Sequence, residues 1–152
     1  MNLIILCGPP ASGKSYFTKT ITNEKVVTIS RDAIRLPLLK EGEKYFSHEK
    51  EVYKTFYTLI NENLKAGNDV IADATHLNEQ SRNKLIRNIT VSNVDIIIIN
   101  FNTSLRKCLE RNKNRSGKEQ IPESVLIDMW KRFEPATHNE KYEYKEILEI
   151  NE

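Results

Sequence analysis

Eight residues near the N-terminus combine two glycines, a lysine and a hydroxyl side chain in a fixed spacing. Gly8 to Ser15 match G-x-x-x-x-G-K-[ST] at every fixed position. Glycine lets the backbone N–H groups turn inward around phosphate oxygens, the lysine brings a positive charge, and the hydroxyl can complete the ligand shell of Mg²⁺. The motif predicts a nucleoside triphosphate site. We expect its contacts to come from Gly8, Pro9, Ala11, Ser12, Gly13, Lys14 and Ser15, with Ser15 on the metal.

We expect the nucleotide to be ATP rather than GTP. A guanine site of the common kind would need the motif Asn-Lys-x-Asp. Two segments, 83–86 and 112–115, begin with Asn-Lys but lack the aspartate.

An acidic and a basic residue follow the apolar stretch at 26–29. Asp32 would lie at the carboxyl edge of a sheet, where a carboxylate can accept the proton of an attacking hydroxyl. Arg35 lies about one helical turn further on and would point to the same side, where it could hold a phosphate of the acceptor. The alternative is that Asp32 caps a helix and Arg35 is solvated.

A second carboxylate ends another apolar stretch, at 70–72. Asp73 could hold Mg²⁺ through water or orient an acceptor, together with the nearby Thr75. A helix or turn cap is the alternative for Asp73.

Six basic residues and one acid, Glu110, lie between Arg106 and Lys118. Most such runs are solvated faces. This run ends in a glycine-containing segment, so a lid over about residues 106–122 could close on the triphosphate. Arg115, at the point where helix gives way to loop, is the candidate to stabilise transition-state charge.

These residues need a scaffold, and apolar runs alternating with amphipathic stretches predict one. We expect strands at 3–7, 26–29, 70–72, 94–101 and 144–150. We expect helices at 14–21, 49–66, 79–88, after Thr103 as a cap, and from Pro122 with Val125, Met129 and Phe133 on one face. β-branched runs such as Ile96 to Ile99 are typical of parallel strands buried on both faces. The fold class is therefore α/β, an open parallel sheet of about five strands with helices on both faces.

Composition limits the remaining possibilities. The 152 residues fit one domain, and the net charge of +2 does not by itself imply a nucleic-acid partner. Cys7 and Cys108 show no metal-ligand spacing and are expected to be reduced thiols. No secretory signal or membrane-spanning stretch is recognisable, so we expect a cytoplasmic protein with no membrane partner and no evident protein partner.

Five stretches in order resemble the polynucleotide 5′-hydroxyl kinases, especially the kinase domain of phage-type end-healing enzymes. They are 8–15, 30–35, 73–78 with Arg82, 110–115 and 121–126 with Met129. These stretches span about residues 1–134. The resemblance implies a P-loop kinase fold, which we expect to form a single domain over residues 1–152, and transfer of the γ-phosphate of ATP, with Mg²⁺, to the 5′-hydroxyl of DNA or RNA. A viral origin, with action in the host cytoplasm, would also fit.

The resemblance also assigns roles by position. Lys14 and Ser15 would serve ATP and Mg²⁺, and Asp32 would be the general base. Arg35 would grip the acceptor phosphate, Asp73 would support the acceptor or metal, and Arg115 would be the lid arginine.

The chain departs from the pattern in two places, and alternatives stay open. Pro10 and Ala11 replace the more usual proline–glycine pair, and the Asp-x-Asp-Gly-Thr phosphatase motif is absent. A kinase of a small-molecule hydroxyl would use the same machinery. A nucleotide-dependent switch that hydrolyses ATP slowly would need no acceptor base. An ATP-independent RNA-binding protein fits least, because the sequence shows no pattern of stacking aromatic residues.

Overall fold

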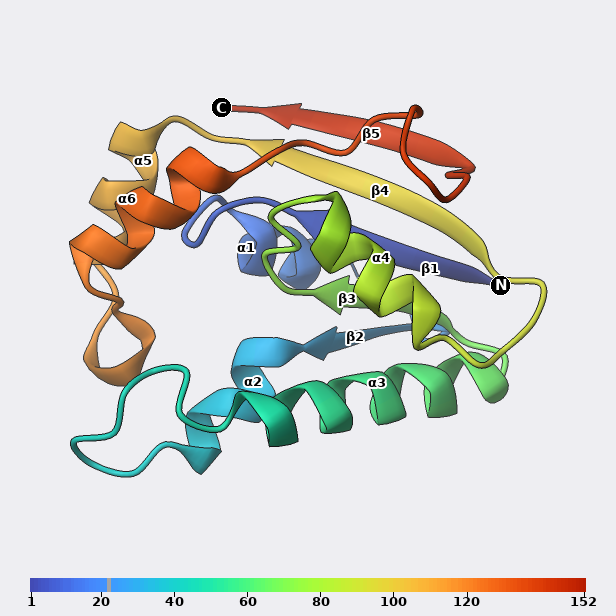
Figure 1. The fold of residues 1–152 in the computed structure, drawn as a ribbon, viewed down its shortest axis with the longest axis horizontal. Coiled ribbons are helices and arrows are strands. Elements are labelled where there is room, and N and C mark those ends of the chain that lie inside the picture. Colours follow the sequence, from blue (N-terminus) through green and yellow to red (C-terminus); the bar gives the residue numbers. More distant parts are fainter. Residues whose placement is uncertain (22) are drawn as a thin grey trace.

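The computed structural model describes residues 1–21 and 23–152, which form five strands and six α-helices (Figure 1). The strands are β1 Asn2–Cys7, β2 Val26–Ser30, β3 Asp69–Asp73, β4 Asp95–Asn102 and β5 Glu146–Asn151. The helices are α1 Lys14–Thr20, α2 Arg31–Arg35, α3 Glu49–Lys65, α4 Glu79–Arg87, α5 Leu105–Lys113 and α6 Glu123–Arg132. Two 3₁₀ turns cover Leu36–Leu38 and Gly117–Glu119.

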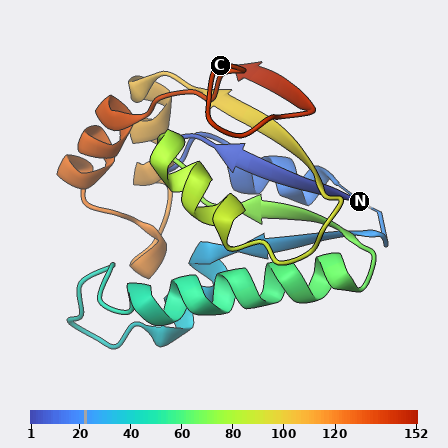
Figure 2. The ribbon, with the colours of Figure 1, turned by 45° about the vertical axis from the view of Figure 1, so that its right-hand side comes forward.

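The five strands form one sheet in the order β2-β3-β1-β4-β5, with every neighbouring pair parallel. The predicted α/β fold with a five-stranded parallel sheet is therefore confirmed. β1 lies at the centre, and its carboxyl end meets those of its neighbours at the same edge. Parallel sheets of this kind bind ligands at that edge. In Figures 1 and 2, α2, α5, α6 and the segment after α2 gather there.

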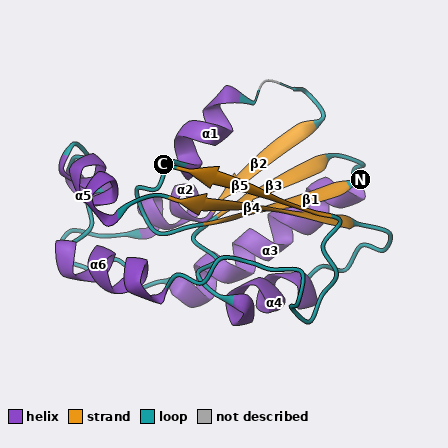
Figure 3. Ribbon diagram, turned by 90° about the horizontal axis from the view of Figure 1, so that it is seen from above, coloured by secondary structure: helices purple, strands orange, loops and turns teal. Residues whose placement is uncertain are grey.

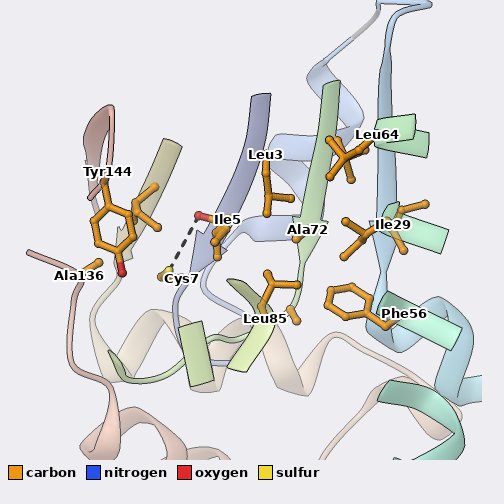
Figure 4. Close-up of a cluster of buried hydrophobic side chains, with 14 residues drawn as sticks. Leu3, Ile5, Cys7, Ile29, Phe56, Leu64, Ala72, Leu85, Ala136 and Tyr144 are labelled. Carbon is orange, nitrogen blue, oxygen red and sulfur yellow. Dashed lines mark hydrogen bonds between the residues drawn. The ribbon is translucent and has the colours of Figure 1, made fainter. Parts of the chain in front are cut away.

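Helices cover both faces of the sheet, as Figure 3 shows with α1 on one side and α3 and α4 on the other. On the α3 side, Leu3 and Ile5 of β1 pack with Phe56 of α3 and Leu85 of α4 (Figure 4). On the α1 side, Leu6 and Phe101 belong to a smaller cluster that Phe17 covers. Alternate residues of a strand therefore point into two separate cores, one on each face of the sheet. Packing on both faces holds the carboxyl ends of the strands in place.

Three details differ from the sequence-based expectation. α2, which was not anticipated, begins directly after β2, because the Ser30 hydroxyl accepts a hydrogen bond from Ala33 N–H and caps it. Ser104, not Thr103, caps α5. The buried face of α6 comes from Leu126 and Met129, whereas Phe133 lies beyond the helix end.

Among the described residues, no helix is long and apolar enough to cross a membrane.

Candidate active site

The phosphate loop joins the end of β1 to the start of α1. A Cβ on Gly8 would lie 2.8 Å from both Phe101 Cβ and Ser12 Oγ, so this position needs glycine. Gly13 has a φ of 108°, which glycine adopts at little cost. Ala11 has a φ of 61°, a left-handed conformation that costs a residue with a Cβ about 1–2 kcal/mol. The usual glycine at position 11 would avoid that cost.

Contacts from two other strands fix the loop. The Gly8 N–H donates to the carbonyl of Thr75, just past β3, at 2.8 Å. The hydroxyl of Thr103, just past β4, donates to the carbonyl of Ser12 at 2.7 Å. Thr103 is thus a loop anchor rather than the helix cap that the sequence predicted. The central loop is held by the strands on both sides of β1.

Lys14 places a buried positive charge inside the loop. Its ammonium donates to the carbonyls of Gly8 at 2.9 Å and Pro9 at 2.7 Å. Burial lowers its pKa to about 8, against the opposing charges of Asp73 and Asp32. Its third donor reaches the Ser12 hydroxyl at 3.4 Å, so an anionic ligand would bind this poorly hydrated cation by replacing contacts within the loop.

A cavity of about 250 Å³ lies beside the loop, at the carboxyl ends of β1, β2 and β3. It brings together candidates from four separate segments of the chain. The sequence-predicted residues that line it are Ala11, Lys14, Ser15, Asp32, Arg35, Asp73, Thr75 and Arg115. The remaining predicted nucleotide contacts, Gly8, Pro9, Ser12 and Gly13, form the backbone of the adjoining loop.

Asp32 lies in the first turn of α2, and its carboxylate is held through one oxygen. The guanidinium of Arg35 and the hydroxyl of Tyr45 both donate to Oδ1, each at 2.5 Å. Oδ2 has no hydrogen-bond partner among the described residues, and the side chain is 55% exposed. The second oxygen of this cavity-lining carboxylate is therefore not engaged by another described residue. The alternative that Asp32 caps a helix is wrong, because Ser30 is the cap.

Arg35 is buried rather than solvated, with only 4% of its surface exposed. Its Nε and Nη2 donate to the Glu49 carboxylate at 2.8 and 2.5 Å, and its Nη1 contacts Asp32. Burial is the largest single effect and disfavours the charge, but the hydrogen bonds that Arg35 donates to Glu49, together with the neighbouring negative charges, raise the pKa of Arg35 on balance. These carboxylate bonds use three of the five N–H donors of Arg35, so an acceptor phosphate gripped as predicted would have to bind a remaining N–H or replace Asp32.

Asp73 is the last residue of β3. It lies beside the start of α2, because it is paired in register with Ser30, the residue that caps α2. It caps no helix: Asn78 caps α4 instead. Its carboxylate is buried and makes no hydrogen bond to another described residue. Burial raises its pKa, against the opposing charge of Lys14.

Arg115 follows the end of α5 and lies between two cavities. It lines the cavity described above and also a second cavity of about 530 Å³, which is lined by Gly13 and Ser15 as well. It forms no ion pair among the described residues, whereas Arg111 pairs with Glu152 at 2.8 Å. An arginine in this position can reach a ligand that spans both cavities.

The cavity is also lined by residues that the sequence did not single out as site residues, among them Arg31, Tyr45, Phe46 and His76. His76 is buried, its Nδ1–H donates to the Leu6 carbonyl at 2.7 Å, and burial lowers its pKa to about 3. Arg82, by contrast, is structural. It is almost fully buried and pairs with Glu140 at 2.7 Å.

Mg²⁺ fits the donor set of this site. No group of three or more His, Cys, Asp or Glu side chains able to hold a metal occurs within 1–21 and 23–152. Mg²⁺ needs no such group, since it commonly keeps several waters and binds through one or two protein oxygens and substrate phosphates. Ser15 and Asp73 line the same cavity and supply such oxygens.

Known proteins with a similar sequence include a protein family and a viral relative. Residues 3–136 match the family described as AAA domain. The chain is 25% identical over 153 residues to a protein of the Autographa californica nuclear polyhedrosis virus named as a bifunctional polynucleotide kinase/RNA ligase. That alignment covers 92% of this chain and 22% of the relative, so the chain spans about a fifth of the relative's length.

Solved structures share the fold. A chain of the Pnkp1/Rnl/Hen1 RNA repair complex matches with a TM-score of 0.73 and 27% identity, over 86% of this chain and 43% of that one. A sugar kinase from a Janibacter species matches with a TM-score of 0.71 and 15% identity, over 99% of this chain and 85% of that one. Chaetomium thermophilum Kti12 matches with a TM-score of 0.69 and 17% identity, over 98% of this chain and 88% of that one. The family match covers most of the chain and the fold is that of P-loop kinases, so the chain belongs to the AAA domain family and is a P-loop enzyme of the kinase type.

Proposed function

We propose that this protein transfers the γ-phosphate of ATP to the 5′-hydroxyl at the end of a DNA or RNA strand. One observation carries the proposal: a single cavity is lined both by the phosphate-loop residues Lys14 and Ser15 and by a carboxylate, Asp32, with a free oxygen. The resemblance of the chain to a protein named as a polynucleotide kinase/RNA ligase supports the same acceptor.

The proposed chemistry is a single in-line displacement. The acceptor oxygen bonds to the γ-phosphorus as the bond from that phosphorus to the β–γ bridging oxygen breaks, which releases ADP. Oδ2 of Asp32 accepts the hydroxyl proton, while Arg35 and Tyr45 hold Oδ1 in place. Lys14 and Arg115 stabilise the negative charge that spreads over the transferred group.

Nucleotide and metal have separate places in this scheme. The triphosphate would follow the loop to Lys14, and the adenosine would occupy the second cavity, which Arg115 also lines. Ser15 would hold Mg²⁺, with Asp73 acting through water. When bound, this ion neutralises charge on the β- and γ-phosphates.

An exposed aromatic residue favours a nucleic-acid acceptor over a small alcohol. Phe46 lines the cavity that contains Asp32 and is 46% exposed, with its ring packed edge-on against Tyr45 at 4.9 Å. It also lines a groove that carries three lysines and two glutamates, namely Lys40, Lys44, Lys118, Glu41 and Glu43. Bases stack on aromatic faces of this kind, and neighbouring lysines follow the phosphate backbone. Phe46 would be the residue on which the terminal base stacks.

The test is transfer of labelled phosphate from ATP to a panel of acceptors. The panel contains 5′-hydroxyl DNA and RNA oligonucleotides, nucleosides, gluconate and simple alcohols. We expect label on the oligonucleotides, removable by a phosphomonoesterase that acts on 5′ ends. Good transfer to a small alcohol with none to any oligonucleotide would replace the proposal with a small-molecule kinase.

A further inference from the structure

The helices α3 and α4 extend the surface of the cavity away from Asp32. Tyr53 of α3 and Ser81 of α4 line the cavity, each in an early turn of its helix. Toward the other ends of the two helices, the Asn61 side chain donates to the Asn88 carbonyl at 2.8 Å. α3 and α4 therefore run side by side away from the cavity, on the same face of the sheet (Figures 1 and 3).

The flank of α3 that faces α4 is basic and aromatic. A helix has 3.6 residues per turn, so the contacts with α4 place on this flank the residues Lys50, Tyr53, Lys54, Tyr57 and Asn61. By the same geometry, the acidic residues Glu51 and Glu62 point away from α4. The remaining acidic residue of the helix, Glu49, is already bound by Arg35.

The flank of α4 that faces α3 adds two more basic side chains. Lys84 Nζ lies 4.3 Å from the centroid of the Tyr53 ring. Arg87 follows about one turn later, near Tyr57: burial raises the pKa of Tyr57 to about 12, and the charge of Arg87 opposes that shift. Glu79, the acidic residue of α4, lies on the other side of the helix. We call this surface the α3–α4 strip, and its side chains are Lys50, Tyr53, Lys54, Tyr57, Lys84 and Arg87.

The charges of the α3–α4 strip are segregated and unpaired. Its four basic side chains are exposed, and none forms an ion pair among the described residues. Most charge runs are solvated faces with both signs. Here one sign is missing, although the whole chain has 23 basic and 21 acidic residues. The groove beside Phe46, by comparison, mixes its lysines with Glu41 and Glu43.

We propose that the α3–α4 strip binds the single-stranded part of the acceptor, namely the nucleotides that follow the one whose 5′-hydroxyl reacts. The inference rests on the proposed function and adds the path of the strand beyond the cavity. Two observations favour this partner: the strip begins at the cavity that contains Asp32, and it combines unpaired cations with aromatic rings. Surfaces that bind single strands use the same combination, with cations on the phosphates and rings against the bases.

The dimensions of the α3–α4 strip fit a short stretch of nucleic acid. From Tyr53 to Asn61 the helix rises about 12 Å, which holds about three nucleotides at the ~3.4 Å spacing of a stacked strand. The ring centroids of Tyr53 and Tyr57 lie 5.9 Å apart along this path. Lys84 and Arg87, on the opposite side of the strip, bind the phosphates.

The test measures how affinity depends on acceptor length. The ligands are a dinucleotide and a hexanucleotide of thymidine, each with a 5′-hydroxyl and a 3′ fluorophore, titrated at several salt concentrations with a non-hydrolysable ATP analogue present. Wild type is compared with the double variant Lys84→Ala, Arg87→Ala. The matched control is Lys19→Ala, Lys131→Ala, which removes the same charge from exposed positions on α1 and α6.

We expect wild type and the control to bind the hexanucleotide about tenfold more tightly than the dinucleotide, because the longer strand adds phosphate contacts. The Lys84→Ala, Arg87→Ala variant should lose most of that difference and should phosphorylate the dinucleotide at the wild-type rate. Its salt dependence for the hexanucleotide, as the slope of log affinity against log salt, should be shallower by about 1.4, or ~0.7 for each lost phosphate contact.

A further variant, Lys40→Ala, Lys44→Ala, tests the groove beside Phe46 as the competing path. The inference is overturned if this variant, rather than Lys84→Ala, Arg87→Ala, loses the length dependence. It is also overturned if the Lys84→Ala, Arg87→Ala variant keeps the wild-type length dependence, or if wild type shows none. If wild type nonetheless phosphorylates both acceptors, the inference fails while the proposed function stands. Absence of transfer to either acceptor would instead reject the proposed function.

Discussion

Two parts of the cavity, which we propose as its nucleotide side and its acceptor side, are built in different ways. On the nucleotide side, Lys14 and Ser15 follow a loop whose backbone is fixed by hydrogen bonds from the ends of β3 and β4. On the acceptor side, Asp32 is oriented by side chains from the segment between α2 and α3 and from α2 itself. Backbone geometry positions the first group and a side-chain network positions the second.

This difference predicts separable defects. Changes on the nucleotide side should weaken ATP binding and phosphate transfer together. Changes on the acceptor side should spare ATP binding and act on transfer or on acceptor affinity.

Asp32→Asn should give the largest separation. The substitution keeps the shape and removes the proton acceptor, and general-base catalysis is commonly worth about 10²–10⁴-fold. We expect transfer to fall by that amount while the dissociation constant for ATP, measured by direct titration, stays within about twofold. Asp95→Asn is the control, since Asp95 begins β4 at the opposite edge of the sheet. Loss of ATP binding in Asp32→Asn would make Asp32 a nucleotide ligand or a structural residue.

Lys14→Ala should weaken both functions. No other residue of the loop carries a positive charge to the β- and γ-phosphates, so we expect transfer to fall about 10²-fold or more and ATP affinity to fall with it. Lys19→Ala, at an exposed position on the same helix, should behave as wild type. Transfer by Lys14→Ala within threefold of wild type would reject the phosphate-loop assignment.

Arg115→Ala should reduce transfer by roughly tenfold to 100-fold. The effect is smaller because Arg115 is partly exposed and lies in the segment after α5 rather than in the phosphate loop. Single-turnover rates and acceptor affinities, measured side by side, separate the possible roles. If acceptor affinity collapsed while single-turnover chemistry held, Arg115 would belong to the acceptor side instead.

Phe46→Ala should have the smallest effect, a rise of about fivefold in KM for an oligonucleotide acceptor. Stacking contributes about 1–3 kcal/mol per base, and the partial exposure of Phe46 favours the lower end. The rise should vanish with an acceptor whose terminal nucleotide has no base, and Phe46→Trp should restore a normal KM. An equal rise with the abasic acceptor would show that Phe46 only supports Tyr45.

The same contrast explains how much could be predicted from the sequence. The phosphate-loop pattern is local, eight residues long, and its setting between a strand and a helix was predicted correctly. The β-branched runs indicated the parallel strands, which were also predicted correctly. α2 was missed because its five residues are too few for a periodic pattern. Thr103 was placed as a cap because its contact with Ser12 joins residues 91 positions apart.

The acceptor side was predicted only in part for the same physical reason. Asp32 and Arg35 lie one helical turn apart, a spacing that the sequence displays. How α2, α3 and the segment between them pack decides the roles of Tyr45, Glu49 and Arg31. No local sequence pattern encodes that packing. An acidic residue two positions into a short helix gives no sign of which donors will hold it.

The most direct test of the account is whether ATP cleavage and acceptor phosphorylation are coupled in one cavity. ADP formation and phosphorylated oligonucleotide should be measured in the same reaction, with and without the 5′-hydroxyl acceptor. The account predicts one ADP for each phosphorylated end, and very little ADP without acceptor. Release of ADP at the same rate in both reactions, unchanged by Asp32→Asn, would contradict it and indicate a nucleotide-hydrolysing switch.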